Sequence, residues 1–208
     1  MTARGTIAAS GFALLFATSV FATSIALAQT TPPARVRGTI DSVNGQTLTM
    51  KSRDGATVNI KLADNTPVRA VVKASLADVK QGGFVGVTGM PQPDGTQKAI
   101  EIHIFPEALR GTGEGHHPWD LAPNSTMTNG AVDNEVAVSD GRKLVLKYKD
   151  GEKTFVVTPD TAIVAFAPAT MTDVKPGTKA FVTATKQPDG ALTASNIAVG
   201  RDGISPPM

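Results

Sequence analysis

The sequence contains no cysteine, and this absence excludes disulfide bonds and thiol chemistry. Aromatic residues make up only 5% of the chain, with one Trp and one Tyr, so a broad surface of stacking rings is not expected. The chain also lacks an excess of either charge, with 20 Lys and Arg against 18 Asp and Glu. A near-neutral chain has no one-sided basic field for non-specific nucleic-acid binding, and we expect no nucleic-acid partner.

Established reaction motifs are missing as well. The sequence has no Gly-x-Ser-x-Gly elbow, and the glycine-rich run at 111–115 is not followed by the Gly-Lys-Ser/Thr of a phosphate-binding loop. The acids Asp54, Asp94, Asp150 and Asp189 each precede or lie in a turn sequence and are typical of hairpins. We therefore expect no enzyme, no catalytic residue and no certain cofactor.

The longest apolar stretch lies near the N-terminus and has the layout of a secretory signal peptide. Arg4 supplies the positive region, an apolar run extends over about residues 11–26, and Ala-Leu-Ala at 26–28 is a small-x-small cleavage site. Thr and Ser interrupt the run, which falls short of the roughly 20 residues that a spanning helix needs. We expect residues 1–28 to be removed and the mature chain, without a transmembrane segment, to be periplasmic or secreted.

The rest of the chain contains an internal repeat. When residues 76–104 are aligned with residues 171–199, twelve of the 29 pairs are identical, including the Gln-Pro-Asp-Gly runs that begin at Gln92 and Gln187. Average residue frequencies would give about two identities by chance. Upstream, the correspondence continues with an offset that is larger by one residue. The chain therefore holds two copies of one small module.

Each copy has the pattern of short β-strands. Leu48 and Met50 alternate with Thr and Lys, which is the two-residue period of a half-buried strand. Asn44-Gly45 is a hairpin dipeptide, and Ser75 is a plausible cap for one short helical turn. Three meandering strands, a short helix and a hairpin are the order of a small OB-like barrel. A small open β-roll with the same strand order is the alternative.

These patterns predict an all-β protein with two tandem small OB-like β-barrels, each with one short helix, joined by a long connector. The expected parts are a signal peptide at 1–28, a first barrel at 36–105, a connector at 106–130 and a second barrel at 131–199.

The sequence also resembles an exported bacterial OB-like repeat family of unknown function, in tandem copies. The resemblance rests on the segments Gly38-Thr39-Ile40, Asn44-Gly45, Leu48-Thr49-Met50, Asp54-Gly55 and 76–82. It implies the fold and the exported compartment, and it brings no catalytic residue with it. Relatives in that family are sometimes labelled metal-transporter components, but a permease needs membrane spans that we do not expect in the mature chain.

The connector carries the residues with the most distinctive chemistry. In an extended segment Glu114 and His116 project to one side, and Asp120 comes within reach if the chain turns after Pro118. A mixed set of imidazoles and carboxylates suits a divalent ion such as zinc, copper or nickel. The candidate metal ligands are Glu114, His116, His117 and Asp120.

The alternative is a connector that holds no metal and is anchored by the only Trp. Trp119 is then an apolar side chain docked against the barrels, and the histidines are half-exposed polar contacts. On the strand that leads into the connector, the isoleucines of residues 100–104 are expected to face the core. Glu101 and His103 are then left on the opposite face as further docking or ligand candidates.

The expected function is that of a non-enzymatic periplasmic binding or scaffold protein with an unknown ligand and an unknown periplasmic or envelope partner. The alternative is a periplasmic divalent-metal-binding protein that uses the connector His, Glu and Asp residues.

The cleavage site leads to a first prediction. Mass spectrometry of the exported protein should show a chain that starts at Gln29, because signal peptidase cuts after a small-x-small tripeptide. An intact N-terminus on mature, membrane-associated protein would contradict the prediction of export.

Overall fold

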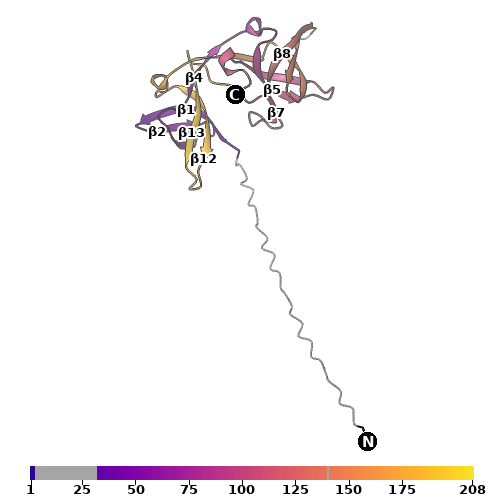
Figure 1. Ribbon diagram of the computed structural model, residues 1–208. Helices are drawn as coiled ribbons and strands as arrows, with labels where there is room; N and C mark the ends of the chain where they lie inside the picture. Colours follow the sequence, from indigo (N-terminus) through magenta and orange to yellow (C-terminus); the bar gives the residue numbers. More distant parts are fainter. Residues whose placement is uncertain (3–31, 140) are drawn as a thin grey trace. The chain divides into compact units, whose positions relative to one another are not determined.

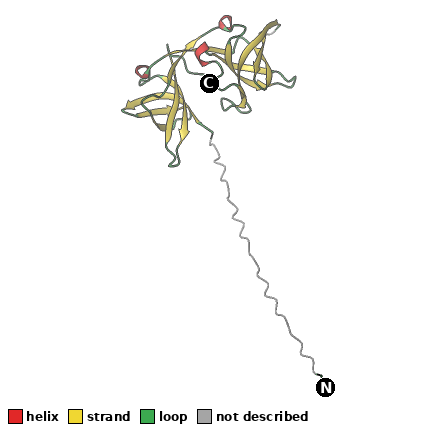
Figure 2. Ribbon diagram, viewed as in Figure 1, coloured by secondary structure: helices red, strands yellow, loops and turns green. Residues whose placement is uncertain are grey.

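The regular structure is almost entirely β-strand, as the two-residue hydrophobic period predicts (Figure 2). The computed structural model describes residues 1–2, 32–139 and 141–208. The expected signal peptide at 1–28 therefore lies outside the described residues, except for its first two. The helical segments of the described part are short 3-10 turns and none is an α-helix. No helix in this part is long and apolar enough to cross a membrane. The all-β expectation is confirmed.

The strands of the two copies follow one another in the same order. The first copy contains β1 (Ala34–Asn44), β2 (Thr47–Ser52), β3 (Thr57–Lys61), β4 (Val68–Lys73), β5 (Phe84–Pro91) and β6 (Gln97–Ile104). The second copy contains β8 (Thr126–Val138), β9 (Gly141–Tyr148), β10 (Gly151–Val157), β11 (Ala162–Pro168), β12 (Lys179–Lys186) and β13 (Leu192–Gly200). Between them the connector forms the 3-10 turn η2 (Glu107–Leu109) and the short strand β7 (Gly115–Pro118).

A single 3-10 turn stands where the sequence predicts a short helix in each copy. The two turns are η1 (Leu76–Asp78) and η3 (Met171–Asp173). The backbone N–H of Ser75 donates to the Asp78 carboxylate at 2.8 Å, and Thr170 N–H donates to Asp173 at 2.9 Å. The turn ends after three residues because Val79 returns to extended backbone and buries its side chain. The short helix predicted for each copy is therefore only a 3-10 turn, and Ser75 caps the first one as predicted.

The closed rings of strands combine the two copies. In ring 1, β1, β2 and β3 pair in succession, β12 pairs with β1, and β13 closes the ring by pairing with both β12 and β3. In ring 2, β8, β9 and β10 are closed in the same way by β5 and β6. Figure 1 shows the indigo strands β1 and β2 beside the yellow strands β12 and β13. Each ring thus takes its last hairpin from the other copy.

The strands β4 and β11 connect the two rings. They pair antiparallel with each other, with Val72 opposite Ala165. β4 also runs parallel to β13 in ring 1, and β11 runs parallel to β6 in ring 2. The segments that carry the chain from one ring to the other are therefore part of one continuous sheet, and their backbone groups are satisfied by strand pairing.

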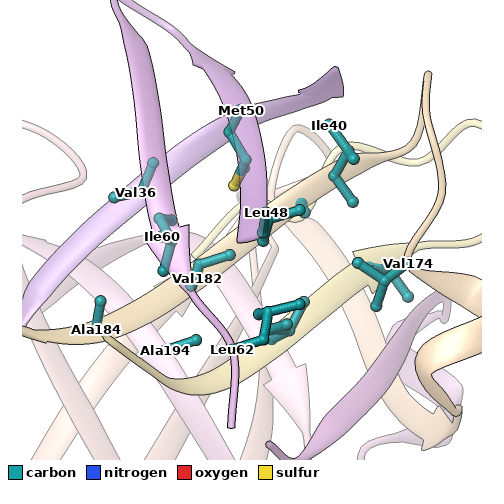
Figure 3. Close-up of a cluster of buried hydrophobic side chains, with 13 residues drawn as sticks. Val36, Ile40, Leu48, Met50, Ile60, Leu62, Val174, Val182, Ala184 and Ala194 are labelled. Carbon is teal, nitrogen blue, oxygen red and sulfur yellow. The ribbon is translucent and has the colours of Figure 1, made fainter. Parts of the chain in front are cut away.

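Both copies contribute to each apolar core. In ring 1, Leu48 and Ile60 of the first copy pack with Val182 and Ala184 of the second, and all four are completely buried (Figure 3). The core of ring 2 is built in the same way around Phe155. It also contains Val85, Val87, Ile102, Leu144 and Leu146. Neither core is complete without side chains from both copies, and interiors this tightly packed tolerate little missing volume.

The exchange of hairpins changes the expected domain boundaries. The ranges 36–105 and 131–199 correspond to the sequence copies, but neither range forms a closed ring in this structure. Residues 32–208 instead form one compact unit. The copies share so many residues in their final hairpins that either hairpin presents a similar edge to either set of three strands. The repeat therefore predicts which strands pair, but it does not specify which copy supplies them.

This arrangement predicts that the copies depend on each other for folding. Residues 32–105 and 106–208, expressed separately, should not melt cooperatively as monomers, because each lacks the hairpin that closes its three-stranded sheet. Mixing the two fragments should restore β-rich circular dichroism and a cooperative melt. A fragment that melts cooperatively as a monomer would show instead that its hairpin folds back onto its own three strands.

Candidate functional site

The connector is ordered and docks against the body of the protein through Trp119. β7 pairs antiparallel with the first residues of β8. Trp119 follows β7 and is half-buried, and its side chain packs on a third apolar cluster. The buried members of this cluster are Val71, Val164, Phe181, Ala198 and Met208. Trp119 is thus an apolar anchor, although its buried indole N–H has no hydrogen-bond partner within the described residues.

Two arginines of β1 contact Trp119 and the next residue, Asp120. The Arg35 guanidinium lies 3.9 Å from the centre of the Trp119 ring, which is a close cation–π contact. Arg37 donates to the Asp120 carboxylate at 2.7 Å through Nη2 and to the main-chain oxygen of Met208 at 2.6 Å through Nε. The guanidinium of Arg37 is therefore fixed in position by partners from two distant segments of the chain.

A third arginine, Arg53, completes a cationic pocket next to this contact. The pocket has a volume of about 390 Å³. Its lining consists of Arg35, Val36, Arg37, Ser52, Arg53, Asp54, Ala56, Val58, Asp120 and Leu121, and we call it the arginine pocket.

Three arginines and two aspartates line the arginine pocket, and both carboxylates already have partners. Asp54 accepts hydrogen bonds from Ser52 Oγ and Ala56 N–H within the β2–β3 hairpin. Asp120 is shared by Arg37, at 2.7 Å, and Arg35, at 3.6 Å. The described residues give the Arg53 side chain one hydrogen-bond acceptor, the carbonyl oxygen of Pro206 at 3.2 Å. The side of the pocket at Arg53 therefore carries positive charge without a paired carboxylate.

The pKa shifts agree with this excess of positive charge. Burial and then the charge of Arg37 lower the pKa of the Arg53 guanidinium. Burial raises the pKa of Asp120, but the hydrogen bond from Arg37 and the charges of Arg37 and Arg35 outweigh this effect and hold the pKa below its ordinary value. Asp120 is thus anionic at neutral pH and only partly balances the arginines.

Three of the four candidate metal ligands have separate hydrogen-bond partners, and the fourth, His117, is exposed. Glu114 accepts a hydrogen bond from the backbone N–H of Lys149 at 3.0 Å, and Asp120 binds Arg37. His116 Nδ1 lies 2.7 Å from Thr128 Oγ1, and burial is the main cause that lowers the pKa of His116. Among the described residues, no three or more His, Cys, Asp or Glu side chains form a group that could hold a metal ion.

Glu101 and His103 are buried, whereas the sequence suggests that they face away from the core. Glu101 is 0% exposed and His103 is 5% exposed. The Glu101 carboxylate lies 2.9 Å from His103 Nδ1 and accepts a hydrogen bond from Thr88 Oγ1 at 2.7 Å. Both residues lie on the face of β6 opposite Ile102, as the alternation predicts, but this face is covered as well, with Phe105 and Phe166 beside the imidazole.

The imidazole of His103 occupies space that a glycine leaves open. A Cβ on Gly86, which is opposite His103 in the β5–β6 pair, would lie 2.1 Å from His103 Nε2. At the same place in the β12–β13 pair, the large residue is Phe181 and the small one is Ala198. The two hairpins therefore fill equivalent space with the large and small residues exchanged. This packing favours a structural role for the buried Glu101–His103 pair.

Sequence reasoning did not single out the arginine pocket. Arg35 and Arg37 are two residues apart on one strand, and Arg53 is distant in sequence. A comparison of the two copies could have pointed to these arginines, because the second copy lacks them. By strand register, Met127 and Asn129 of the second copy stand where Arg35 and Arg37 stand in the first.

The comparisons with known proteins identify a domain but no activity. Residues 37–103 match DUF5666, a domain of unknown function. The match agrees with the predicted resemblance to a family of unknown function. It spans β1 to β6 and so includes three strands of ring 1 together with the hairpin that completes ring 2. The chain matches no curated protein and no solved structure.

The docked Trp119 leads to a spectroscopic prediction. As the only Trp, it should give an emission that is blue-shifted from that of free tryptophan, because its ring packs on an apolar cluster. Trp119→Ala should lower the free energy of unfolding by about 2–3 kcal/mol, and Trp119→Phe by less. Chelator should leave the emission unchanged. A red shift on chelation that zinc reverses would support the metal site instead, and a fully solvent-exposed emission would contradict docking.

Proposed function

We propose that this chain is a non-enzymatic binding protein, exported to the periplasm, whose ligand is an anion held in the arginine pocket. The observation that carries the proposal is that three arginines line one pocket, in which Arg53 has no carboxylate partner among the described residues. A carboxylate, phosphate or sulfate group of a ligand supplies the missing negative charge.

The chemistry of arginine favours such a ligand. A guanidinium presents several N–H donors in a rigid plane, which matches the paired oxygens of carboxylate and phosphate groups. Arg37 is held by Met208 and Asp120 before any ligand arrives, so less side-chain freedom is lost on binding. Arg35 is stacked on Trp119 and is restrained in the same way. The pocket is thus partly preorganised for an anion.

The proposed fold class supports a binding role. We assign each ring to the OB-like barrels, because five strands close with the third strand running parallel to the last one. Barrels of this type bind ligands on their strand faces and loops. In ring 1 the pocket lies beside β1 and the β2–β3 hairpin, which is a rigid support for a binding site.

Arg53 provides the test of anion binding. Isothermal titration of the full-length mature protein with citrate and with pyrophosphate should detect binding that weakens as the salt concentration rises. Arg53→Gln should weaken it by about 10-fold or more, because a hydrogen bond between charged groups contributes about 1.5–3 kcal/mol. Arg53→Lys should retain part of the affinity.

The matched control is Arg142→Gln. Arg142 is also a strand arginine, but it is paired with Glu135 in ring 2, away from the pocket lining. Its substitution should leave the affinity unchanged. Equal affinities for the native protein and Arg53→Gln, or no binding of either anion at millimolar concentration, would refute the proposal.

A further inference from the structure

The first four residues of β1 and of β8 occupy equivalent positions in their rings. Arg35 lies opposite Thr183 and Arg37 opposite Phe181 in the pairing of β1 with β12. In the pairing of β8 with β5, residues 126–129 meet the corresponding residues of the other hairpin in the same register. Ala34–Arg37 in ring 1 and Thr126–Asn129 in ring 2 are therefore matched segments, each with one edge on the exchanged hairpin.

The outer edges of these segments differ. In ring 2, β7 adds to the outer edge of Thr126–Asn129, with Gly115 opposite Asn129 and Pro118 opposite Thr126. In ring 1, the pairing of β1 with β2 begins at Gly38, and no strand of the described residues pairs with the outer edge of Ala34–Arg37. The arginine pocket lies along this edge.

The backbone at this edge is suited to strand pairing. The carbonyl of Arg37 accepts a hydrogen bond from Arg53 N–H at 2.9 Å, so the backbone of Arg37 faces the β2 side of the strand. Because the direction of backbone groups alternates along a strand, Arg35 faces the same side. The N–H and C=O of Arg35 are thus directed to the edge at which β7 binds in the other ring.

The side chains at this edge select for negative charge. Arg35 and Arg37 are two residues apart and share one face of β1, while Val36 points into the core of ring 1. Asp120 already contacts both guanidinium groups, so a strand added beside them places its alternate residues next to a pocket in which Arg53 supplies the positive charge without a carboxylate partner among the described residues.

We propose that the ligand of the arginine pocket is an extended acidic segment of a partner protein, which adds as a strand to the outer edge of Ala34–Arg37. The proposal rests on the anion binding proposed above and specifies its source. Strand addition at a free sheet edge is an established mode of peptide recognition in which main-chain hydrogen bonds provide affinity and alternate side chains provide specificity. Here β7 shows within the same chain how such a strand is seated.

The test compares three synthetic peptides on the full-length mature protein by fluorescence anisotropy. The first peptide alternates Glu and Val, the second has the same sequence with N-methylated amides at alternate positions, and the third has Lys in place of Glu. We expect the first to bind at least 10-fold more tightly than the other two, because only it offers both the backbone donors and the negative charge. Citrate should compete with it.

Two further measurements locate the contact. Hydrogen exchange should show new protection of the backbone amides of Arg35 and Arg37, which face the outer edge, when the Glu-Val peptide is bound. Arg35→Glu should abolish binding, whereas Arg142→Glu, a change on a strand of ring 2, should not.

The possible failures are distinguishable. If the N-methylated peptide binds as tightly as the unmodified one while citrate and pyrophosphate also bind, strand addition is wrong and anion binding stands. If neither the peptides nor the small anions bind, the proposed function itself fails. If light scattering shows that the peptide-free protein is a dimer that the peptide dissociates, the edge is occupied by a second copy of this chain, and the proposal of a different partner is overturned.

Discussion

Ring closure by an exchanged hairpin is the constraint on which the rest of this structure depends. The first three strands of each copy form an open sheet. The hairpin of the other copy pairs with both edges of that sheet and contributes about half of the core. The exchange also requires β4 and β11 to cross between the rings, where they pair with each other. The third apolar cluster forms at this crossing, and it provides the surface on which Trp119 docks.

Divergence between the copies then determines where function can arise. The hairpins keep their turn residues and most of their core positions, but the strands that open each ring differ. In ring 2 the connector returns as β7 and covers the outer edge of Thr126–Asn129. In ring 1 the matched edge carries Arg35 and Arg37 and adjoins a pocket. The candidate site therefore lies where the two copies differ in sequence, at the start of the first strand of ring 1, and not at the residues that the copies share.

Much of the fold was predictable from local patterns. The alternation at Leu48 and Met50 and the cap at Ser75 depend only on neighbouring residues, and the structure confirms both. The predicted hairpin is also present, with Gly45 at positive φ, but its turn is Gly45-Gln46, one residue later than Asn44-Gly45. The site was predictable only in part. Trp119 was identified as an anchor because it is a lone large apolar residue among polar ones, but its partners come from residues as distant as Val71 and Met208.

The sequence by itself determined the all-β class, the two copies, the hairpin turns and the order of strands within each copy, because these follow from steric preferences and hydrophobic alternation over a few residues. Only the tertiary structure decided which copy completes each ring, because two similar hairpins offer similar edges and no local pattern distinguishes them. It also decided that Glu101 and His103 are buried and that Arg53 meets Arg35 and Arg37. The burial of Glu101 and His103 and the position of Arg53 both depend on which distant segments pack against a strand. The hydrophobic alternation along the strand carries no information about those segments.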